Sequence, residues 1–294
     1  MGALDQDWVA RYGRGPSATT VKRVISLHRN VRALLGEGEY DTILQGSYKN
    51  DTALADMNDV DILAIRQDVT KRGNGLFKAI AWDPLFKDIE RRIEKDGRYA
   101  GKWTRHDKCV TVETGVHIDI VPAVAVDHPG KDPIVVHSFN ADSEKKNWPR
   151  GHYENGAAKN QRTNGAFKAA VRLFKRWARA HFPGTKIAPS YYLESLLYSL
   201  NDDLFKGEPA ADFLRLSETI LARHGGFGGY NLRILPRIAG EGDLLCGDEW
   251  PDESFTVFLG KLRESALHAR AASMQDAADR AKAAWRMVFA GHDP

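Results

Sequence analysis

Cysteine is scarce in this chain, and long apolar runs are missing. Only two cysteines, Cys109 and Cys246, occur in 294 residues. They cannot form a disulfide framework, and neither lies in a histidine cluster typical of a zinc site. No apolar run reaches the roughly 18 residues of a membrane-spanning helix. Residues 1–16 contain Asp5 and Asp7 and lack the apolar core of a secretory signal. The sequence therefore predicts a cytoplasmic protein without a membrane partner.

The chain also lacks a strong charge of either sign. Its 42 lysines and arginines nearly balance 39 aspartates and glutamates, which leaves a formal net charge of +3. A dedicated surface for duplex nucleic acid usually brings a larger basic excess, so we expect none. The hydrophobic content of 43% in 294 residues is enough to bury a large core, as one bilobal unit or as two small domains.

What the sequence does contain is a pair of closely spaced acids. Residues 60–65 are apolar and rich in β-branched side chains, which predicts a buried strand, and Asp59 and Asp61 stand at its start. Side chains two residues apart in a strand point to the same face. Two like charges held side by side are costly unless a cation lies between them. Mg²⁺ suits one or two carboxylates together with substrate phosphates, and Mn²⁺ is an alternative.

A third acid is expected to join this pair. Asp119 lies in the middle of an apolar, strand-like stretch, residues 116–122. If this strand lies beside the first one, the three acids converge and hold two metal ions about 3.5–4 Å apart, the spacing used in phosphoryl transfer. Asp119 would then accept the proton of the attacking hydroxyl or orient that hydroxyl. An ion pair of Asp119 with Arg105 or Lys108 is the alternative interpretation.

A glycine and a serine precede the acids. Gly46 and Ser47 follow a predicted strand at residues 40–45, and eleven residues separate Ser47 from Asp59. A glycine lets the backbone approach a phosphate, and a helix that opens after it would point N–H groups at the anion. Ser47 would donate its hydroxyl to the same triphosphate. Each motif alone is common in turns and strand ends, but the full combination indicates nucleotidyl transfer.

The combined pattern, Gly46-Ser47 followed by Asp59-Val60-Asp61 and then Asp119, resembles the polymerase-β-like nucleotidyltransferase superfamily. Within it, the chain is similar to the cGAS/DncV-like enzymes, or CD-NTases, over most of its length. The resemblance implies an α+β fold, a sheet core with a C-terminal helical lobe, bilobal with the active site in the cleft. It also implies NTP substrates, ATP among them, that are joined into cyclic or linear oligonucleotide messengers with release of pyrophosphate. Such messengers act in bacterial antiphage signalling, and some family members have a regulatory protein partner.

Other functions stay open on these residues. Related motifs serve transfer to a macromolecule or a drug, such as addition to a tRNA 3′ end, nucleotidylation of a protein or modification of an aminoglycoside. A non-catalytic nucleotide-binding module that keeps the fold is a further alternative. Three acids argue against a pure binder, because without metal they would repel the phosphates.

Basic residues concentrate on one predicted helix in the second half of the chain. Lys168, Arg172, Lys175 and Arg179 follow helical spacing and form a cationic stripe beside an apolar one. Such a stripe is either a solvated face or a surface for an anion. The proposed triphosphate would be that anion.

The resemblance gives roles to three residues of this half. Lys175 corresponds to a helix lysine that contacts the donor triphosphate. Ser190 corresponds to a serine that touches the same phosphates, and Tyr191 to an aromatic residue that stacks on the base. Because Pro189-Ser190 precedes an apolar run, a cap of the following helix is the alternative role for Ser190.

Hydrophobic periodicity and turn residues predict the order of the elements. Residues 1–155 are expected to form a catalytic lobe that includes the N-terminal helix, and residues 156–294 a helical lobe that completes the nucleotide site. The glycine-rich segment 225–229 is interpreted as a turn, because no Lys-Ser/Thr follows it as in a phosphate loop. The expected helices cover about residues 17–35, 84–96, 162–181, 190–201, 210–223 and 254–290, and the strands 40–45, 60–65, 108–113 and 117–122.

Overall fold

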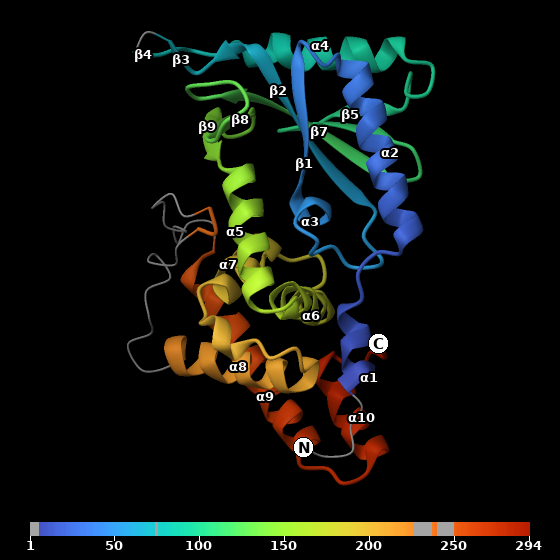
Figure 1. The fold of residues 1–294 in the computed structure, drawn as a ribbon, viewed down its shortest axis with the longest axis vertical. Coiled ribbons are helices and arrows are strands. Elements are labelled where there is room, and N and C mark those ends of the chain that lie inside the picture. The colour runs from blue at the N-terminus through green and yellow to red at the C-terminus, as the bar shows by residue number, and fades with distance from the viewer. Residues whose placement is uncertain (1–5, 74–75, 226–236, 240–249) are drawn as a thin grey trace. The chain divides into compact units, whose positions relative to one another are not determined.

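The computed structural model of the protein describes residues 6–73, 76–225, 237–239 and 250–294. The chain divides into two compact units, one of Pro16–Tyr153 and one of Met1–Gly15 together with Glu154–Pro294. Figure 1 shows a sheet with helices in the first unit and helices in the second. This is the α+β composition that the sequence predicts. Within the described ranges, no helix is both long enough and apolar enough to cross a bilayer.

The unit Pro16–Tyr153 is built on a mixed sheet. The central pair, β2 with β7, is parallel, and the other paired strands of this sheet are antiparallel. A short hairpin, β3 with β4, leaves the far end of β2. The strand order is β1 (Tyr40–Gln45), β2 (Asp59–Thr70), β7 (His117–Ala125), β6 (Val110–Glu113) and β5 (Trp103–Arg105). A further strand, β8 (Ile134–Ser138), pairs with β7 and with β9 (Ser143–Asn147). The separate hairpin consists of β3 (Arg72–Gly73) and β4 (Leu76–Phe77).

Two helices, α2 (Ala18–Leu35) and α4 (Trp82–Lys95), cover one face of this sheet. Helix α2 begins after Ser17, whose hydroxyl accepts a hydrogen bond from the Thr20 backbone N–H (3.1 Å). Apolar side chains of both helices pack against every second residue of the central strands. The shared core contains Val24, Val31 and Leu35 of α2, Phe86, Ile89 and Ile93 of α4, and Val60, Ile62, Ala64, Ile118 and Ile120 of the sheet.

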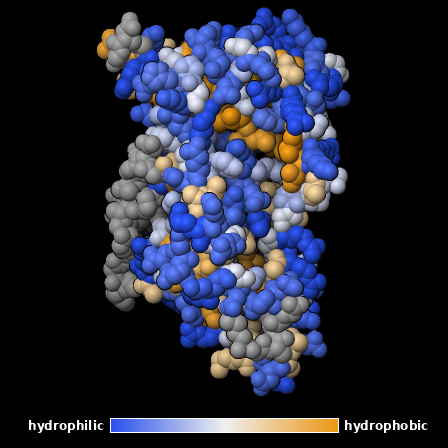
Figure 2. Space-filling view, in the orientation of Figure 1, coloured by the Kyte–Doolittle hydropathy of each residue, from blue (hydrophilic) through white to orange (hydrophobic). Residues whose placement is uncertain are grey.

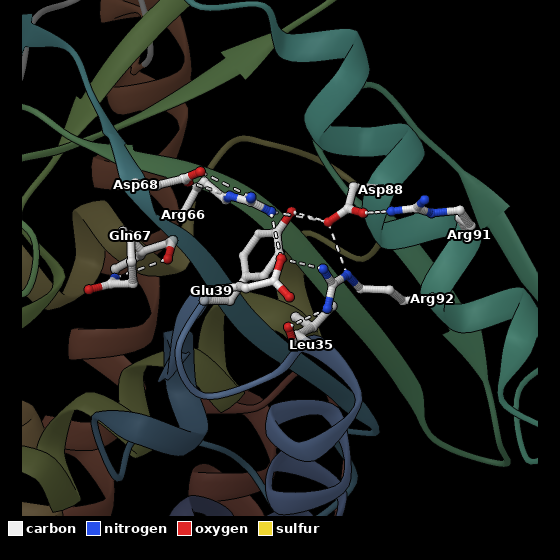
Figure 3. Close-up of polar contacts among 10 residues, drawn as sticks. Leu35, Glu39, Arg66, Gln67, Asp68, Asp88, Arg91 and Arg92 are labelled. Atoms are coloured by element: carbon white, nitrogen blue, oxygen red, sulfur yellow. Dashed lines mark hydrogen bonds and ion pairs between the residues drawn. The ribbon is translucent and has the colours of Figure 1, made fainter.

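A polar network joins α2, α4 and the first two strands (Figure 3). Asp88 of α4 accepts hydrogen bonds from the Tyr40 hydroxyl (3.0 Å), from Arg66 (3.2 Å) and from Arg92 (3.0 Å). Arg92 also donates to the Leu35 carbonyl (2.8 Å) at the end of α2. Burial raises the pKa of Asp88, but its hydrogen bonds outweigh burial and hold that pKa below the usual value. The network therefore keeps a charged carboxylate where four elements meet.

The second unit is helical. Its core is aromatic, with Phe174, Trp177, Phe213 and Phe258 buried together. Residues 1–15 were expected with the sheet, but Trp8, Val9 and Tyr12 belong to this helical core. The helices are α1 (Gln6–Ala10), the 3-10 turn η1 (Arg11–Gly13), α5 (Pro149–Arg162), α6 (Ala166–His181), α7 (Ser190–Tyr198), the 3-10 turn η2 (Asp202–Leu204), α8 (Pro209–His224), α9 (Asp252–Ser273) and α10 (Ala278–Val288).

Two segments differ from the sequence expectations, and a third lies outside the described residues. The polar stretch before residue 162 forms β9 and α5, which periodicity did not indicate. The single helix expected over 254–290 is two helices, because α9 ends at Ser273 and α10 begins at Ala278. The glycine-rich turn falls almost entirely on residues 226–229, and Cys246 is likewise outside the described residues.

Candidate active site

The three candidate acids lie on the sheet face opposite α2 and α4. Val60 and Ile62 of β2 pack under those helices, so Asp59 and Asp61, at the alternate positions, point to the other face. The same alternation in β7 places Asp119 on that other face. Asp61 and Asp119 are half-buried, and Asp59 is exposed.

Strand register brings the acids together. β2 and β7 pair in parallel, with Asp61 directly beside Asp119 and Asp59 beside His117. The expectation that the two acid-bearing strands are neighbours is therefore confirmed. Since adjacent strands lie about 4.8 Å apart, the Asp61 and Asp119 side chains project next to each other.

A tight turn after β1 closes over Asp61. Gly46 has a positive φ of +68°, and a Cβ at this position would overlap the Asp61 carboxylate oxygen Oδ2. The turn continues into α3 (Gly46–Lys49), a single helical turn that contains Ser47. The Tyr48 hydroxyl donates to the Met57 carbonyl (2.7 Å), which ties α3 to the segment leading into β2. Burial, and then the negative charge of Asp59, raise the pKa of Tyr48. The Gly46–Ser47 turn therefore lies against the acids, as its spacing in the sequence suggested.

Asp119 has a protein partner on the next strand. The Thr111 hydroxyl of β6 donates to Asp119 Oδ1 at 2.5 Å. The Cys109 thiol lies 3.7 Å from the same hydroxyl oxygen. Burial, the largest effect, and the charges of Asp119 and Asp61 raise the pKa of Cys109 to about 11, while the hydrogen bond between Cys109 and Thr111 lowers that pKa. The charges of Asp119 and Asp61 therefore both act on the Cys109 thiol.

Arg105 was one of two bases considered as a partner of Asp119. It pairs instead with Asp83 (2.8 Å) and Glu90 (3.3 Å) of α4. The guanidinium also lies over the ring of Phe86, with 4.8 Å between the guanidinium carbon and the ring centroid. An ion pair between Arg105 and Asp119 is therefore wrong, and within the described residues Asp119 forms none with Lys108 either. Asp119 accepts a hydrogen bond from the neutral Thr111 hydroxyl.

Thr111 and Cys109 were not recognised as site residues from the sequence. A signal was present, since Val110 and Val112 alternate with them and assign them to the face opposite the apolar core. What the sequence did not give is the antiparallel register that sets Thr111 opposite Asp119. Pairing partners of separate strands are fixed by tertiary structure rather than by local pattern.

The acids suit a magnesium site by their chemistry. Three carboxylates on one face of two adjacent strands are the hard oxygen ligands that Mg²⁺ takes in nucleotide sites. In the described part of the chain, no group of at least three His, Cys, Asp or Glu side chains is close enough to hold a metal ion. The backbone register sets Asp61 beside Asp119, so the carboxylates of the two neighbouring strands are on one face of the sheet.

The candidate residues of the helical unit have different environments. Lys168 and Lys175 of α6 are buried, with 9% and 4% of their surface exposed. Arg172 is held by a hydrogen bond from its Nε to the Gly13 carbonyl (3.0 Å). The interpretation of the basic stripe as a solvated face is therefore wrong for both lysines.

Ser190 and Tyr191 begin α7. Ser190 is exposed and is the first helical residue. The N-cap is Pro189, and no side chain caps this helix end. The capping role considered for Ser190 is therefore wrong. Tyr191 keeps 37% of its surface exposed and packs edge to face on Tyr192, with ring centroids 5.8 Å apart. An exposed hydroxyl and an exposed ring at one helix start leave both groups accessible to a ligand.

Comparison with known proteins identifies relatives over most of the chain. Residues 154–225 match the family model of the cGAS/DncV-like nucleotidyltransferase C-terminal helical domain. Cyclic UMP-AMP synthase of Rhodothermus marinus is 34% identical over 232 residues, which cover 69% of this chain and 79% of the synthase. Cyclic AMP-AMP-AMP synthase of an Acinetobacter species is 28% identical, with 95% of this chain and 82% of the synthase covered.

Solved structures agree with these relatives. The structure of Rhodothermus marinus CdnE c-UMP-AMP synthase with Apcpp and Upnpp matches with a TM-score of 0.72 at 26% identity, over 89% of this chain and 96% of that chain. Escherichia coli CdnC with ATP matches with a TM-score of 0.76, over 98% of each chain, and at 17% identity this likeness concerns the fold alone. The shared polymerase-β-like fold and the identity and coverage of the first synthase lead to one conclusion: the chain belongs to the cGAS/DncV-like nucleotidyltransferases, the CD-NTases.

Proposed function

We propose that the protein joins nucleoside triphosphates into a cyclic oligonucleotide and releases pyrophosphate at each step. The observation that carries this proposal is the parallel register of β2 and β7, which sets Asp61 beside Asp119, with Asp59 on the same face and the Gly46 turn against Asp61. The two synthases named above both make products that contain AMP, which supports ATP as one substrate. In this proposal the product is a second messenger of antiphage signalling, made in the cytoplasm where nucleoside triphosphates are available.

The proposal assigns the triphosphate to residues of both halves of the sequence. Gly46 and Ser47 would bind it through backbone N–H groups and the serine hydroxyl. Lys175 and Ser190 would contact the same phosphates, and Tyr191 would stack on the base. The exposure of Tyr191 and its place at the start of α7 support the role of Tyr191.

Asp59, Asp61 and Asp119 would hold two Mg²⁺ ions, or Mn²⁺ in their place. Bound there, the ions supply positive charge that offsets the charge of the triphosphate and of the departing pyrophosphate. The Gly46 turn keeps Asp61 in a fixed position against the backbone, because no room remains between them. Asp119 is held from its other side by the Thr111 hydroxyl.

The transfer itself needs no protein nucleophile. A ribose hydroxyl of the acceptor attacks the α-phosphorus of the donor, so that a new phosphorus–oxygen bond forms. The bond from the α-phosphorus to the bridging oxygen of the β-phosphate breaks, and pyrophosphate carries away the electron pair. Asp119 accepts the hydroxyl proton. The protein contributes orientation and preorganised charge.

Labelled nucleotides test the proposal directly. We expect wild-type protein with Mg²⁺ and four α-labelled NTPs to yield small products that resist phosphatase. Asp61→Asn and Asp59→Asn should lower product formation by at least about 10²–10³-fold, the loss typical when one electrostatic stabiliser is removed. The measurement is product quantity by chromatography, with masses identified by mass spectrometry.

A matched control comes from the same strand. Asp68 lies near the far end of β2, where it pairs with Arg66 at 2.5 Å, and Asp68→Asn should keep wild-type activity. Circular dichroism of each variant checks that the fold is intact. Label that moves only into added RNA, protein or drug would contradict oligonucleotide synthesis. Wild-type rates in Asp61→Asn would contradict the assigned site.

A further inference from the structure

We propose that Thr111 is a positioning residue for Asp119, with the Cys109 thiol as the donor that orients the Thr111 hydroxyl. The inference deepens the proposed function and rests on it for the role of Asp119. It concerns Thr111 of β6, Asp119 of β7 and Cys109, the residue just before β6, of which only Asp119 was expected to belong to the site. Thr111 and Cys109 would act through Asp119 and would touch no substrate themselves.

The geometry of Thr111 is well defined. It lies opposite Asp119 in the antiparallel pairing of β6 and β7, and only 6% of its surface is exposed. The distance of 2.5 Å between Thr111 Oγ1 and Asp119 Oδ1 is that of a short, charge-assisted hydrogen bond. A β-branched side chain in a strand has few accessible rotamers, so this donor is held in place. The contact is therefore a fixed support for one carboxylate oxygen.

The direction of the hydrogen bonds follows from the number of protons. A carboxylate can only accept, so the single hydroxyl hydrogen of Thr111 goes to Asp119. The Thr111 oxygen then has lone pairs left, and the Cys109 sulfur lies 3.7 Å from it. Since the hydroxyl hydrogen is already used, the thiol must be the donor in that contact. The order is therefore thiol to hydroxyl to carboxylate.

Oδ1 of Asp119 accepts the hydrogen bond from Thr111. The proposal assigns the other oxygen, Oδ2, to the proton of the attacking hydroxyl or to a metal ion. A free aspartate side chain would rotate among several orientations. A misplacement of about 1 Å at a reacting group costs about 10²-fold in rate, so the support has a catalytic value beyond stability.

Three substitutions test the proposal. Thr111→Val keeps the shape and removes the hydroxyl, and it should lower kcat by about 10–100-fold with little change in KM. Thr111→Ser restores a hydroxyl and should recover most of the rate. Thr42→Val is the control, because Thr42 is a β1 residue with 4% exposure whose hydroxyl has no hydrogen-bond partner in the described part of the chain. It should leave kcat unchanged.

A second readout does not depend on turnover. Binding of Mn²⁺, followed by the electron paramagnetic resonance signal of the free ion, should weaken by about 10-fold or more in Thr111→Val, as for other residues that orient a metal ligand. Thr111→Ser and Thr42→Val should bind Mn²⁺ as the wild type does. Thermal unfolding of each variant separates this effect from loss of fold.

A double-mutant cycle with Asp119→Asn distinguishes positioning from general stabilisation. If Thr111 acts through Asp119, Thr111→Val should cost nothing further in residual activity or in Mn²⁺ binding once Asp119 is replaced. Additive losses would overturn the proposal, as would wild-type kcat and Mn²⁺ binding in folded Thr111→Val, or a Thr111→Ser variant that recovers neither. A wild-type chain that binds no Mn²⁺ and makes no product would instead overturn the proposed function on which the inference rests.

Discussion

At the scale of single residues, the Gly46 turn shows how close packing and charge act together. From the sequence, the glycine was explained by the approach of a phosphate. The structure adds a second reason, since a side chain at position 46 would occupy the space of an Asp61 carboxylate oxygen. The glycine is required by the protein's own carboxylate, whatever ligand lies above it.

A substitution separates this overlap from backbone strain. Gly46→Ala should abolish Mn²⁺ binding and nucleotide transfer, because the added Cβ displaces the Asp61 carboxylate. It should also destabilise the fold by about 1–2 kcal/mol or more, the cost of a left-handed conformation for a residue with a side chain. The measurements are the metal titration and the free energy of unfolding in denaturant.

Gly101 provides the matched control. Its φ is also +68°, but a Cβ there would meet nothing within 4 Å. Gly101→Ala should therefore share the conformational cost and keep metal binding and activity. Equal activity in Gly46→Ala and Gly101→Ala would show that the overlap of a Cβ at position 46 with Asp61 does not affect nucleotide transfer.

At the scale of elements, periodicity predicted β1 and α2, which have a regular apolar pattern, and missed α5, which has none. The strand at Tyr40–Gln45 is confirmed over its full length, and the helix expected from residue 17 begins one residue later, with Ser17 as its cap. Helix α5 was missed because glycine, histidine and asparagine favour helices weakly and show no apolar stripe. Tertiary contacts hold this helix, such as the hydrogen bond from Asn155 to the Ile238 carbonyl at 2.7 Å.

The strongest of these contacts involves Lys159 of α5. Its side chain is 3% exposed, and Nζ donates to the Leu200 carbonyl (2.7 Å) and to Asp202 (2.5 Å). Rings of Phe167, Tyr198 and Phe205 lie 5.7, 5.5 and 4.9 Å from the ammonium. The ammonium is therefore compensated by a carboxylate, a carbonyl and three ring faces, which anchors α5 to the segment that follows α7. These rings and the carboxylate come from parts of the sequence that no local pattern connects to Lys159.

Removal of this charge should weaken the helical unit. We expect Lys159→Met to lower the free energy of unfolding by about 2–3 kcal/mol, the range for a lost hydrogen bond to a charged group. Denaturant unfolding followed by circular dichroism measures the loss. Lys186→Met, at an exposed position of the same unit, should change stability by less than about 0.5 kcal/mol. A loss no larger in Lys159→Met than in this control would show that the buried contact contributes nothing net.

At the scale of the whole molecule, the sheet face of the three candidate acids could be predicted, but the pairing of the strands that carry them could not. Asp59, Asp61 and Asp119 were chosen because acids in apolar strands require compensation, and alternation correctly assigned their faces. The pairing of β2 with β7 entered only as a condition, because α4, β5 and β6 separate these strands in the chain. Thr111 was missed for the same reason. The residues that pair between two strands distant in sequence depend on the burial of both faces of the whole sheet. No short segment of the sequence determines this pairing.

Stability of the whole chain should depend on pH through His224. Burial, together with the charge of Arg223, lowers the pKa of His224 from 6.5 to about 4. The unfolded state therefore binds more protons between these values, so stability is fully present above pH 6.5 and is lost as the pH falls toward 4. The difference of more than two pKa units corresponds to a loss of about 3 kcal/mol.

His224→Leu tests this assignment. The variant should lose less unfolding free energy than the wild type between pH 7 and pH 5, because it has no imidazole to protonate. His128→Leu, at an exposed position, should keep the wild-type dependence. Identical pH profiles for wild type and His224→Leu would mean that other groups cause the acid sensitivity.

The parallel pairing of β2 and β7 also determines when, during synthesis of the chain, the three acids can come together. The ribosome completes β2, with Asp59 and Asp61, well before it reaches β7 and Asp119. A parallel pair cannot close through a simple hairpin and must wait for the intervening crossover. A nascent or truncated chain that ends before β7 therefore carries the first two acids without their neighbour. Under the proposed function, nucleotide transfer therefore requires a chain whose translation has passed Asp119.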